Sequence, residues 1–144
     1  MPGFLERMNR AVALGTILAL GWYLIRVVPQ VTSWPLDEVS WKGEMVIAVV
    51  VFVATLIADI VRAAISNRNE LDEAGVVDDE RDHAAERRGD AWGGHAMHGT
   101  AFVALMLLVL EFDPFWAANT LFVGAMLAGL VSTLVKILTY RGSV

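Results

Sequence analysis

The three histidines of the chain lie close together in the sequence, between two apolar blocks. His83, His95 and His98 all fall in the charged stretch from Asp78 to Gly99. His95 and His98 are three residues apart, so they share one face of a helix. Imidazole nitrogens and carboxylate oxygens are zinc ligands, and histidine changes its charge near neutral pH. Residues of these types could therefore bind a metal ion or relay protons.

Two further ionisable residues, Asp59 and Arg62, lie inside the apolar run that precedes this stretch. At 1.5 Å per residue, Asp59, His95 and His98 lie roughly 6 to 10 Å inside their apolar runs. If the two runs pack as antiparallel helices, all four residues form a shallow cluster within the membrane. Ionisable residues in membrane segments usually face the bundle interior, and they are candidates for function.

Three interpretations of this cluster are open. In the one we favour, Asp59 pairs with Arg62 or with a histidine and locks two helices together. In the second, His95, His98 and Asp59 bind zinc or another divalent metal, and the charged helix adds ligands from Asp79, His83 or Glu86. In the third, the cluster relays protons or ions, as in a small transporter. A haem is not expected, because two histidines on one face of one helix cannot supply opposite axial ligands.

The composition is that of a membrane protein. The chain has 144 residues, of which 56% are hydrophobic and 19% are charged. A soluble domain usually has about a quarter charged residues. The length predicts a single domain over residues 1–144. The absence of cysteine excludes disulfides and thiolate zinc sites.

Apolar runs of about 20 residues predict an all-α integral membrane protein with four spans. The predicted spans cover residues 11–28, 45–65, 91–110 and 115–138. Pro29 to Glu44 is predicted as a loop, and Asp113 with Pro114 as a very short turn. A short amphipathic helix over residues 78–90 is predicted between spans two and three. The short turns favour an up-down-up-down four-helix bundle.

The distribution of basic residues predicts the orientation in the membrane. If the N-terminus is cytoplasmic, nine of the 11 Lys and Arg residues lie on the cytoplasmic side. These nine are Arg7, Arg10, Arg62, Arg68, Arg81, Arg87, Arg88, Lys136 and Arg141. Only Arg26 and Lys42 lie on the other side. The positive-inside rule then places both termini and the charged helix in the cytoplasm, and the protein in the cytoplasmic (inner) membrane.

Small residues recur every fourth position in the first and fourth spans. The rows are Ala11, Gly15 and Ala19; Gly124, Ala128 and Ser132; and Ala125, Gly129 and Thr133. Small residues let membrane helices approach closely. The rows predict tight packing within the chain, a homodimer interface, or both.

The charged helix has a ladder of acidic residues, and it also carries a motif. Asp78, Asp82, Glu86 and Asp90 are four apart, so they repel one another and need partners elsewhere. Candidate partners are Arg62, Arg68, the terminal groups around Arg7, Arg10 and Arg141, a second subunit or a cation. The motif residues are Asp79, Glu80, Arg81, Asp82, Arg88, Gly89 and Asp90. This "DERD"-type motif resembles that of a family of small bacterial and archaeal four-helix membrane proteins of unknown function. The resemblance implies an integral membrane protein and no particular activity.

No catalytic motif accompanies these residues. The sequence has no phosphate-binding glycine loop, no nucleophile elbow and no HExxH motif, so we do not expect an enzyme. Nucleic-acid binding is not expected either, because acidic residues interrupt the basic ones. No cofactor is predicted, although zinc stays an alternative. The expected function is that of a membrane accessory, scaffold or regulatory protein whose charged helix contacts a cytoplasmic protein partner or its own twin. The alternative is a small transporter or metal-binding protein that uses Asp59, His95 and His98.

Overall fold

Long α-helices make up almost all of the described chain. The computed structural model describes residues 4–66 and 80–140, with the side chains of 4–8, 59, 63–66, 80–82 and 140 left aside. The elements are α1 (Phe4–Ser33), the short 3-10 helix η1 (Leu36–Glu38), α2 (Trp41–Ser66), α3 (Glu80–Val109) and α4 (Pro114–Tyr140). Each of the four α-helices is long and apolar enough to cross a membrane. The prediction of an all-α chain with four such helices is confirmed.

The first helix continues through a proline that was predicted to end it. Pro29 lies inside α1, which ends at Ser33. Proline removes one backbone hydrogen bond of the helix, and here the loss falls in its last two turns. Side chains supply other bonds there: Gln30 Nε2 donates to the carbonyl of Arg26 (2.9 Å), and the Thr32 hydroxyl donates to that of Val28 (3.2 Å). The loop predicted from Pro29 is therefore shorter, and α2 begins at Trp41.

The predicted charged helix and the predicted third span form one helix. α3 runs without interruption from Glu80 to Val109, so the expected break near residue 90 is wrong. The charged residues of its first part are good helix formers, and no proline interrupts them. Glycine costs about 1 kcal/mol in a helix interior. Gly89 and Gly93 are nevertheless buried in α3, where packing against α4 offsets that cost.

The turn between α3 and α4 satisfies its own backbone groups. The amides of Phe112 and Glu111 donate to the carbonyls of Leu107 (3.0 Å) and Leu108 (3.1 Å), which is a Schellman motif. Glu111 has a positive φ of 59°. Asp113 then caps α4, because its Oδ1 accepts the amide of Phe115 (2.8 Å). Pro114 suits the first helical position, where no amide is needed.

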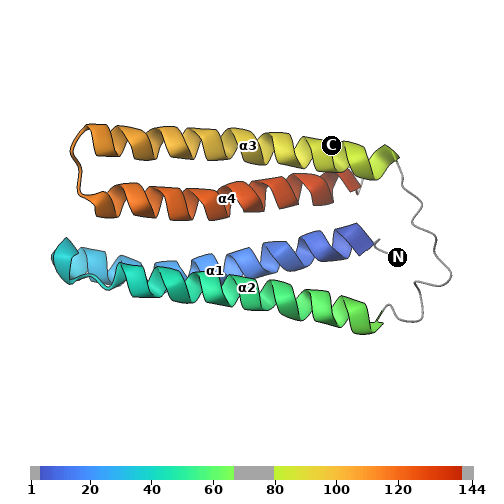
Figure 1. Ribbon diagram of the computed structural model, residues 1–144, viewed down its shortest axis with the longest axis horizontal. Helices are drawn as coiled ribbons and strands as arrows, with labels where there is room; N and C mark the ends of the chain where they lie inside the picture. Colours follow the sequence, from blue (N-terminus) through green and yellow to red (C-terminus); the bar gives the residue numbers. More distant parts are fainter. Residues whose placement is uncertain (1–3, 67–79, 141–144) are drawn as a thin grey trace.

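The four helices form two hairpins that meet through α1 and α4. Successive helices run in opposite directions, with the N-terminus and the end of α4 at the same end of the molecule (Figure 1). α1 packs against α2 and α4, and α3 packs against α4. Within the described residues no comparable interface joins α2 to α3. α2 and α3 are therefore the outer helices.

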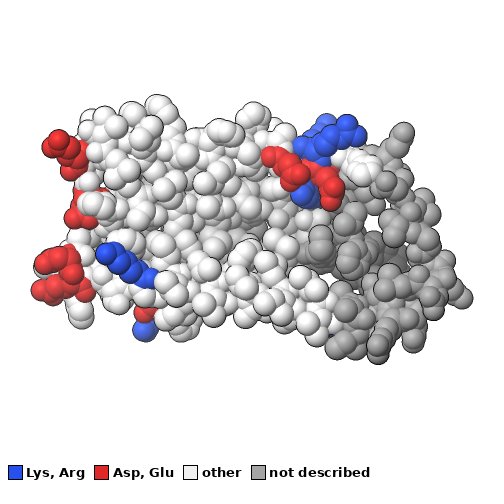
Figure 2. Space-filling view, in the orientation of Figure 1, with Lys and Arg blue, Asp and Glu red and all other residues white. Residues whose placement is uncertain are grey.

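The core is small and lies around α1. Its buried members are Ala19, Tyr23, Val27, Val39, Ala48 and Phe115. About 39% of the span of α1 is buried, against 12% for α2, 11% for α4 and 6% for α3. On the face shown in Figure 2, charged side chains gather at the two ends and leave a wide uncharged middle. That distribution suits a protein with a hydrocarbon layer around its middle.

Candidate functional site

The predicted intramembrane cluster requires α2 and α3 to pack against each other, and within the described residues they do not. Asp59 and Arg62 lie on α2, whereas His95 and His98 lie on α3. Arg62, His95 and His98 are exposed, and the side chain of Asp59 is outside the described residues. Among the described side chains, no hydrogen bond or ion pair joins Arg62 to either histidine. The predicted cluster assumed that α2 and α3 pack as antiparallel neighbours, and no such interface is found within the described residues.

The three histidines lie on a single helix, in two separate places. His83 is twelve residues before His95, which is about 18 Å along α3. One ion therefore cannot bind His83 together with the other two. Within the described residues, no group of three His, Asp or Glu side chains could hold a metal ion. His95 and His98 stay together, as an exposed pair on adjacent turns of α3.

The pair points away from the rest of the chain. Gly93 faces α4, and at 100° per residue His95 and His98 lie roughly 140–160° around the helix from it. His98 Nδ1 lies 2.7 Å from the carbonyl oxygen of Gly94. A carbonyl only accepts hydrogen bonds, so Nδ1 carries the proton and donates it. The neutral imidazole of His98 then has its lone pair on Nε2.

The cytoplasmic motif divides between solvent and the α3–α4 interface. Asp79 is outside the described residues, as are the side chains of Glu80, Arg81 and Asp82. Arg88 is exposed, Gly89 is buried, and Asp90 pairs with Lys136 Nζ at 2.8 Å. Lys136, on α4, was not among the partners expected for the acidic ladder. Lys136 lies 23 residues after Asp113, and Asp90 lies 23 residues before Asp113. The hairpin turn therefore brings Asp90 and Lys136 to the same level.

Glycines set the distance between α3 and α4. A Cβ at Gly89 would lie 2.7 Å from the backbone oxygen of Ser132, and one at Gly93 would lie 3.1 Å from that of Ala128. A Cβ at Gly124 would meet the Thr100 side chain. Backbone atoms cannot rotate away, so a side chain at Gly89 or Gly93 requires α4 to shift, whereas at Gly124 the Thr100 side chain must move. The row Gly124, Ala128 and Ser132 therefore packs against α3 within the chain.

The other predicted rows differ in their environment. In the first span, Ala19 is fully buried, and a Cβ at Gly15 would lie 2.7 Å from Thr55 Oγ1 of α2. In the second row of α4, Thr133 is buried, whereas Ala125 and Gly129 are exposed. Packing within the chain thus uses most of the small residues. A homodimer interface through these rows stays a prediction.

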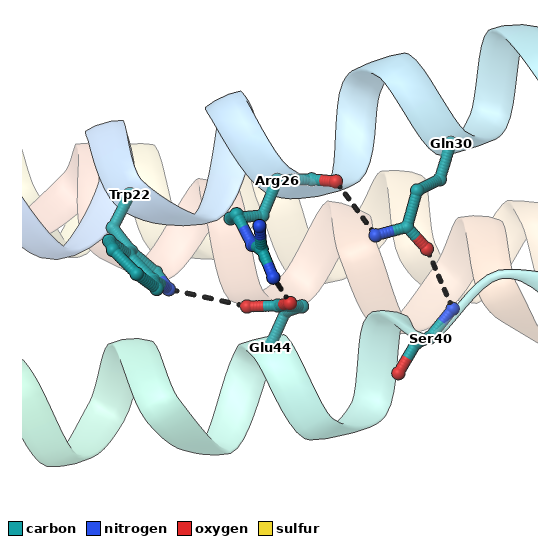
Figure 3. Close-up of polar contacts among 5 residues, drawn as sticks. All are labelled: Trp22, Arg26, Gln30, Ser40 and Glu44. Carbon is teal, nitrogen blue, oxygen red and sulfur yellow. Dashed lines mark hydrogen bonds and ion pairs between the residues drawn. The ribbon is translucent and has the colours of Figure 1, made fainter.

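A buried carboxylate joins α1 to α2, and the sequence analysis did not single it out. Glu44 of α2 is 7% exposed. Its Oε2 accepts the indole Nε1–H of Trp22 (3.3 Å), and its Oε1 accepts Arg26 Nε–H (3.1 Å) (Figure 3). We call these three residues the Glu44 cluster. Beside it, Gln30 Oε1 accepts the amide of Ser40 at 3.0 Å.

The Glu44 cluster could have been found from the turn that precedes α2. Arg26 lies nine residues before Pro35, and Glu44 lies nine residues after it. Opposite charges at equal distances from a hairpin turn meet when the two helices pack in antiparallel fashion. The same rule pairs Asp90 with Lys136. Both pairs join the two helices of a hairpin.

A third polar contact joins α1 to α4 in the core. The Tyr23 hydroxyl donates to Asn119 Oδ1, and Asn119 Nδ2 donates to the carbonyl of Phe115 (2.8 Å). The Tyr23 ring also packs edge-on against Phe122, with centroids 4.7 Å apart. Every polar atom of this contact has a partner, so it fixes the register of two helices. It offers no open coordination or reaction site.

The polar contacts described above join helices, whereas no hydrogen bond or ion pair joins the exposed histidine pair to another described helix. His95 and His98 thus present imidazole nitrogens on the outer side of α3. Comparisons with family models, curated proteins and solved structures found no match to this chain. The resemblance to the four-helix membrane family stays a prediction.

Proposed function

We propose that the protein is a small multi-pass membrane protein without catalytic activity, which works as a scaffold by associating through α3. The observation that supports this most is the contrast between polarity and burial in α3. Its span is 6% buried, the lowest of the four, and its mean hydropathy of 1.3 is also the lowest. Polar groups of membrane helices normally face other helices and not lipid. A helix of this kind is suited to binding a partner.

The proposed orientation has both termini in the cytoplasm. The exposed acidic residues Asp37, Glu38, Glu111 and Asp113 lie on the two connections at the other end. Arg26 and Lys42 lie near that end, whereas Arg10, Arg62, Arg87, Arg88 and Lys136 lie toward the other end. This excess of basic residues at one end agrees with the positive-inside rule. The charged first part of α3 then extends into the cytoplasm, where a partner protein can reach Arg87 and Arg88.

Cysteine labelling tests the membrane topology. The chain has no cysteine, so each introduced thiol gives an unambiguous result. In intact cells, an impermeant maleimide should label Asp37→Cys and should label Arg87→Cys only after the membrane is opened. Labelling of Arg87→Cys in intact cells would reverse the orientation.

In-cell photo-crosslinking tests the scaffold role. A photo-reactive residue at Phe102, which is 62% exposed on α3, should give protein adducts. The same residue at Ile25, which is 75% exposed on α1, should give mainly lipid adducts. Equal protein adducts at both positions, or none at Phe102, would contradict association through α3.

The second candidate function is that of a metal-binding membrane protein. It is favoured by His98, because metal-ligating histidines usually donate their other ring N–H to a carbonyl or carboxylate. The contact from His98 Nδ1 to the Gly94 carbonyl is of this kind. Elemental analysis of the purified protein, with and without His98, tests this function.

A further inference from the structure

We propose that two copies of this chain bind one zinc-class divalent cation between their α3 helices, through His95 and His98 of each copy. The inference rests on the proposed association through α3 and names both the partner and the ligand. Each chain supplies half of the coordination set. The site is incomplete without the second copy.

The residues that would line the contact are defined by their spacing. Ala91, His95, His98, Phe102, Leu105 and Val109 alternate at steps of four and three, and all six are exposed. We call them the outer face of α3. Alternating steps of four and three keep side chains on one stripe when two helices supercoil. The stripe lies opposite the glycines that pack on α4, so a second helix can approach it.

The two histidines are what distinguish the outer face from an ordinary lipid-facing surface. Exposed Phe, Leu and Val suit lipid as well as protein, so they favour neither. His95 and His98 lie on the first turns of the apolar part of α3, at roughly 6 and 10 Å from Ala91 along the helix. Ionisable side chains at such depth usually face a partner or a water-filled cavity. Within the described residues no other helix of the same chain covers them.

The chemistry of the pair suits a divalent transition metal. Zinc takes four ligands in tetrahedral geometry, and neutral imidazole nitrogen is one of its ordinary donors. Two metal ligands at i and i+3 of one helix are an established arrangement in helical bundles. In the neutral form of His98, the Nδ1–H bonded to the Gly94 carbonyl leaves the lone pair on Nε2, which is the atom that would bind a metal.

A single chain cannot complete this site. Within the described residues there is no third His, Asp or Glu that could join the pair on one ion. A twofold axis along the membrane normal places two parallel α3 helices side by side with equivalent residues facing each other. The four imidazoles then come from two identical helices, and no cysteine or carboxylate is required. His83 lies about 18 Å away along α3 and takes no part.

The test uses the full chain in detergent micelles and in lipid nanodiscs. Metal-free protein receives Zn²⁺, and zinc per chain and protein mass are measured by elemental analysis and light scattering. We expect one zinc per two chains and a shift from monomer to dimer that a chelator reverses. The His95→Ala/His98→Ala variant should lose both the zinc and the shift. His83→Ala, at another exposed position of the same helix, should keep both.

A second variant distinguishes failure of the metal site from failure of the association. Phe102→Cys, the only thiol in its chain, forms a disulfide when two outer faces meet. Cross-linking that persists without zinc and in the double histidine variant would overturn the metal site and leave association through α3 intact. No cross-linking in any condition would overturn both. One zinc per chain with no change in mass would also overturn the shared site.

Discussion

The two hairpins have the same antiparallel topology, yet different side chains hold them. In the α3–α4 hairpin, Gly89, Gly93 and Gly124 bring the two helices so close that an added Cβ would meet atoms of the other helix. In the α1–α2 hairpin, Glu44 is buried between the helices and accepts hydrogen bonds from Trp22 and Arg26. The first interface depends mainly on the absence of side-chain volume. The second has one such close approach, that of Gly15 to Thr55, and adds a buried charge.

In the membrane environment that we propose for this protein, the difference has a physical basis. Apolar burial drives helix association weakly there, so close packing and polar contacts take its place. The α3–α4 hairpin mainly uses close packing, and its ion pair is peripheral, since the Asp90 side chain is 68% exposed. The Glu44 side chain is 8% exposed, so its contacts are shielded from water. Size changes should therefore damage the first interface most, and loss of a charge should damage the second.

The largest effect is expected for Gly93→Leu. A Cβ at this position would already lie 2.8 Å from Ser132 Cβ and 3.1 Å from the Ala128 carbonyl oxygen. A leucine must push α4 away, so we expect a loss of about 3 kcal/mol or more in the free energy of unfolding. Unfolding in mixed micelles, followed by circular dichroism, measures it.

The neighbouring glycine provides the control. Nothing lies within 4 Å of a Cβ at Gly94. Gly94→Leu should therefore change the free energy of unfolding by less than about 1 kcal/mol, with a gain from helix propensity. Equal destabilisation by the two substitutions would mean that glycine does not set the helix separation.

The second effect in size is expected for Glu44→Ala. The substitution leaves the Trp22 indole N–H and the Arg26 guanidinium without their acceptor. Hydrogen bonds to a charged group contribute about 1.5–3 kcal/mol each when one partner is removed from a buried site. Arg26 is half-exposed and recovers part of this from water, so we expect a loss of about 2 kcal/mol. Unfolding in mixed micelles, followed by circular dichroism, measures this loss too.

The sequence predicts the helices better than it predicts which helices pack against each other. Four apolar runs fix four helices, and Asp113-Pro114 fixes the start of α4, because a cap and a proline act locally. Pro29 did not end the helix as predicted. A proline near a helix end removes a single backbone hydrogen bond, and side-chain hydrogen bonds can offset that loss. The predicted charged helix (78–90) and the predicted third span (91–110) are continuous in α3. Charged residues that favour helix formation do not end a helix where the sequence changes from charged to apolar.

The candidate site was harder to predict, because it depends on which helices touch. Short turns force α1 onto α2 and α3 onto α4, whereas the long polar segment after Ser66 sets no such constraint. The cluster of Asp59 and Arg62 with the histidines assumed that α2 meets α3. Contacts between residues at equal distances from a turn, such as that of Arg26 with Glu44, could have been predicted from the sequence. The outward direction of the His95 side chain could not have been predicted from it.

A smaller effect is expected for Asp90→Ala in the other hairpin. Its carboxylate binds Lys136 at 2.8 Å, but it is mostly exposed to solvent. Exposed ion pairs contribute about 0–1 kcal/mol, and salt screens them. The loss should be at most about 1 kcal/mol and should shrink in high salt, unlike that of Glu44→Ala. A loss larger than that of Glu44→Ala would contradict the contrast between the two hairpins.

The smallest effect is expected at the turn of the α3–α4 hairpin, where Glu111 adopts a φ of 59°. A side chain strains this left-handed conformation, and the Schellman motif formed by Leu107, Leu108 and Phe112 favours glycine there. Glu111→Gly relieves the strain but also loosens the unfolded chain, so we expect a net gain of only about 0.5 kcal/mol. Glu111→Ala removes the same charge and keeps the Cβ, so it should give no gain. If alanine stabilises the protein as much as glycine does, repulsion between Glu111 and Asp113 is the cause, and backbone strain at this turn is not.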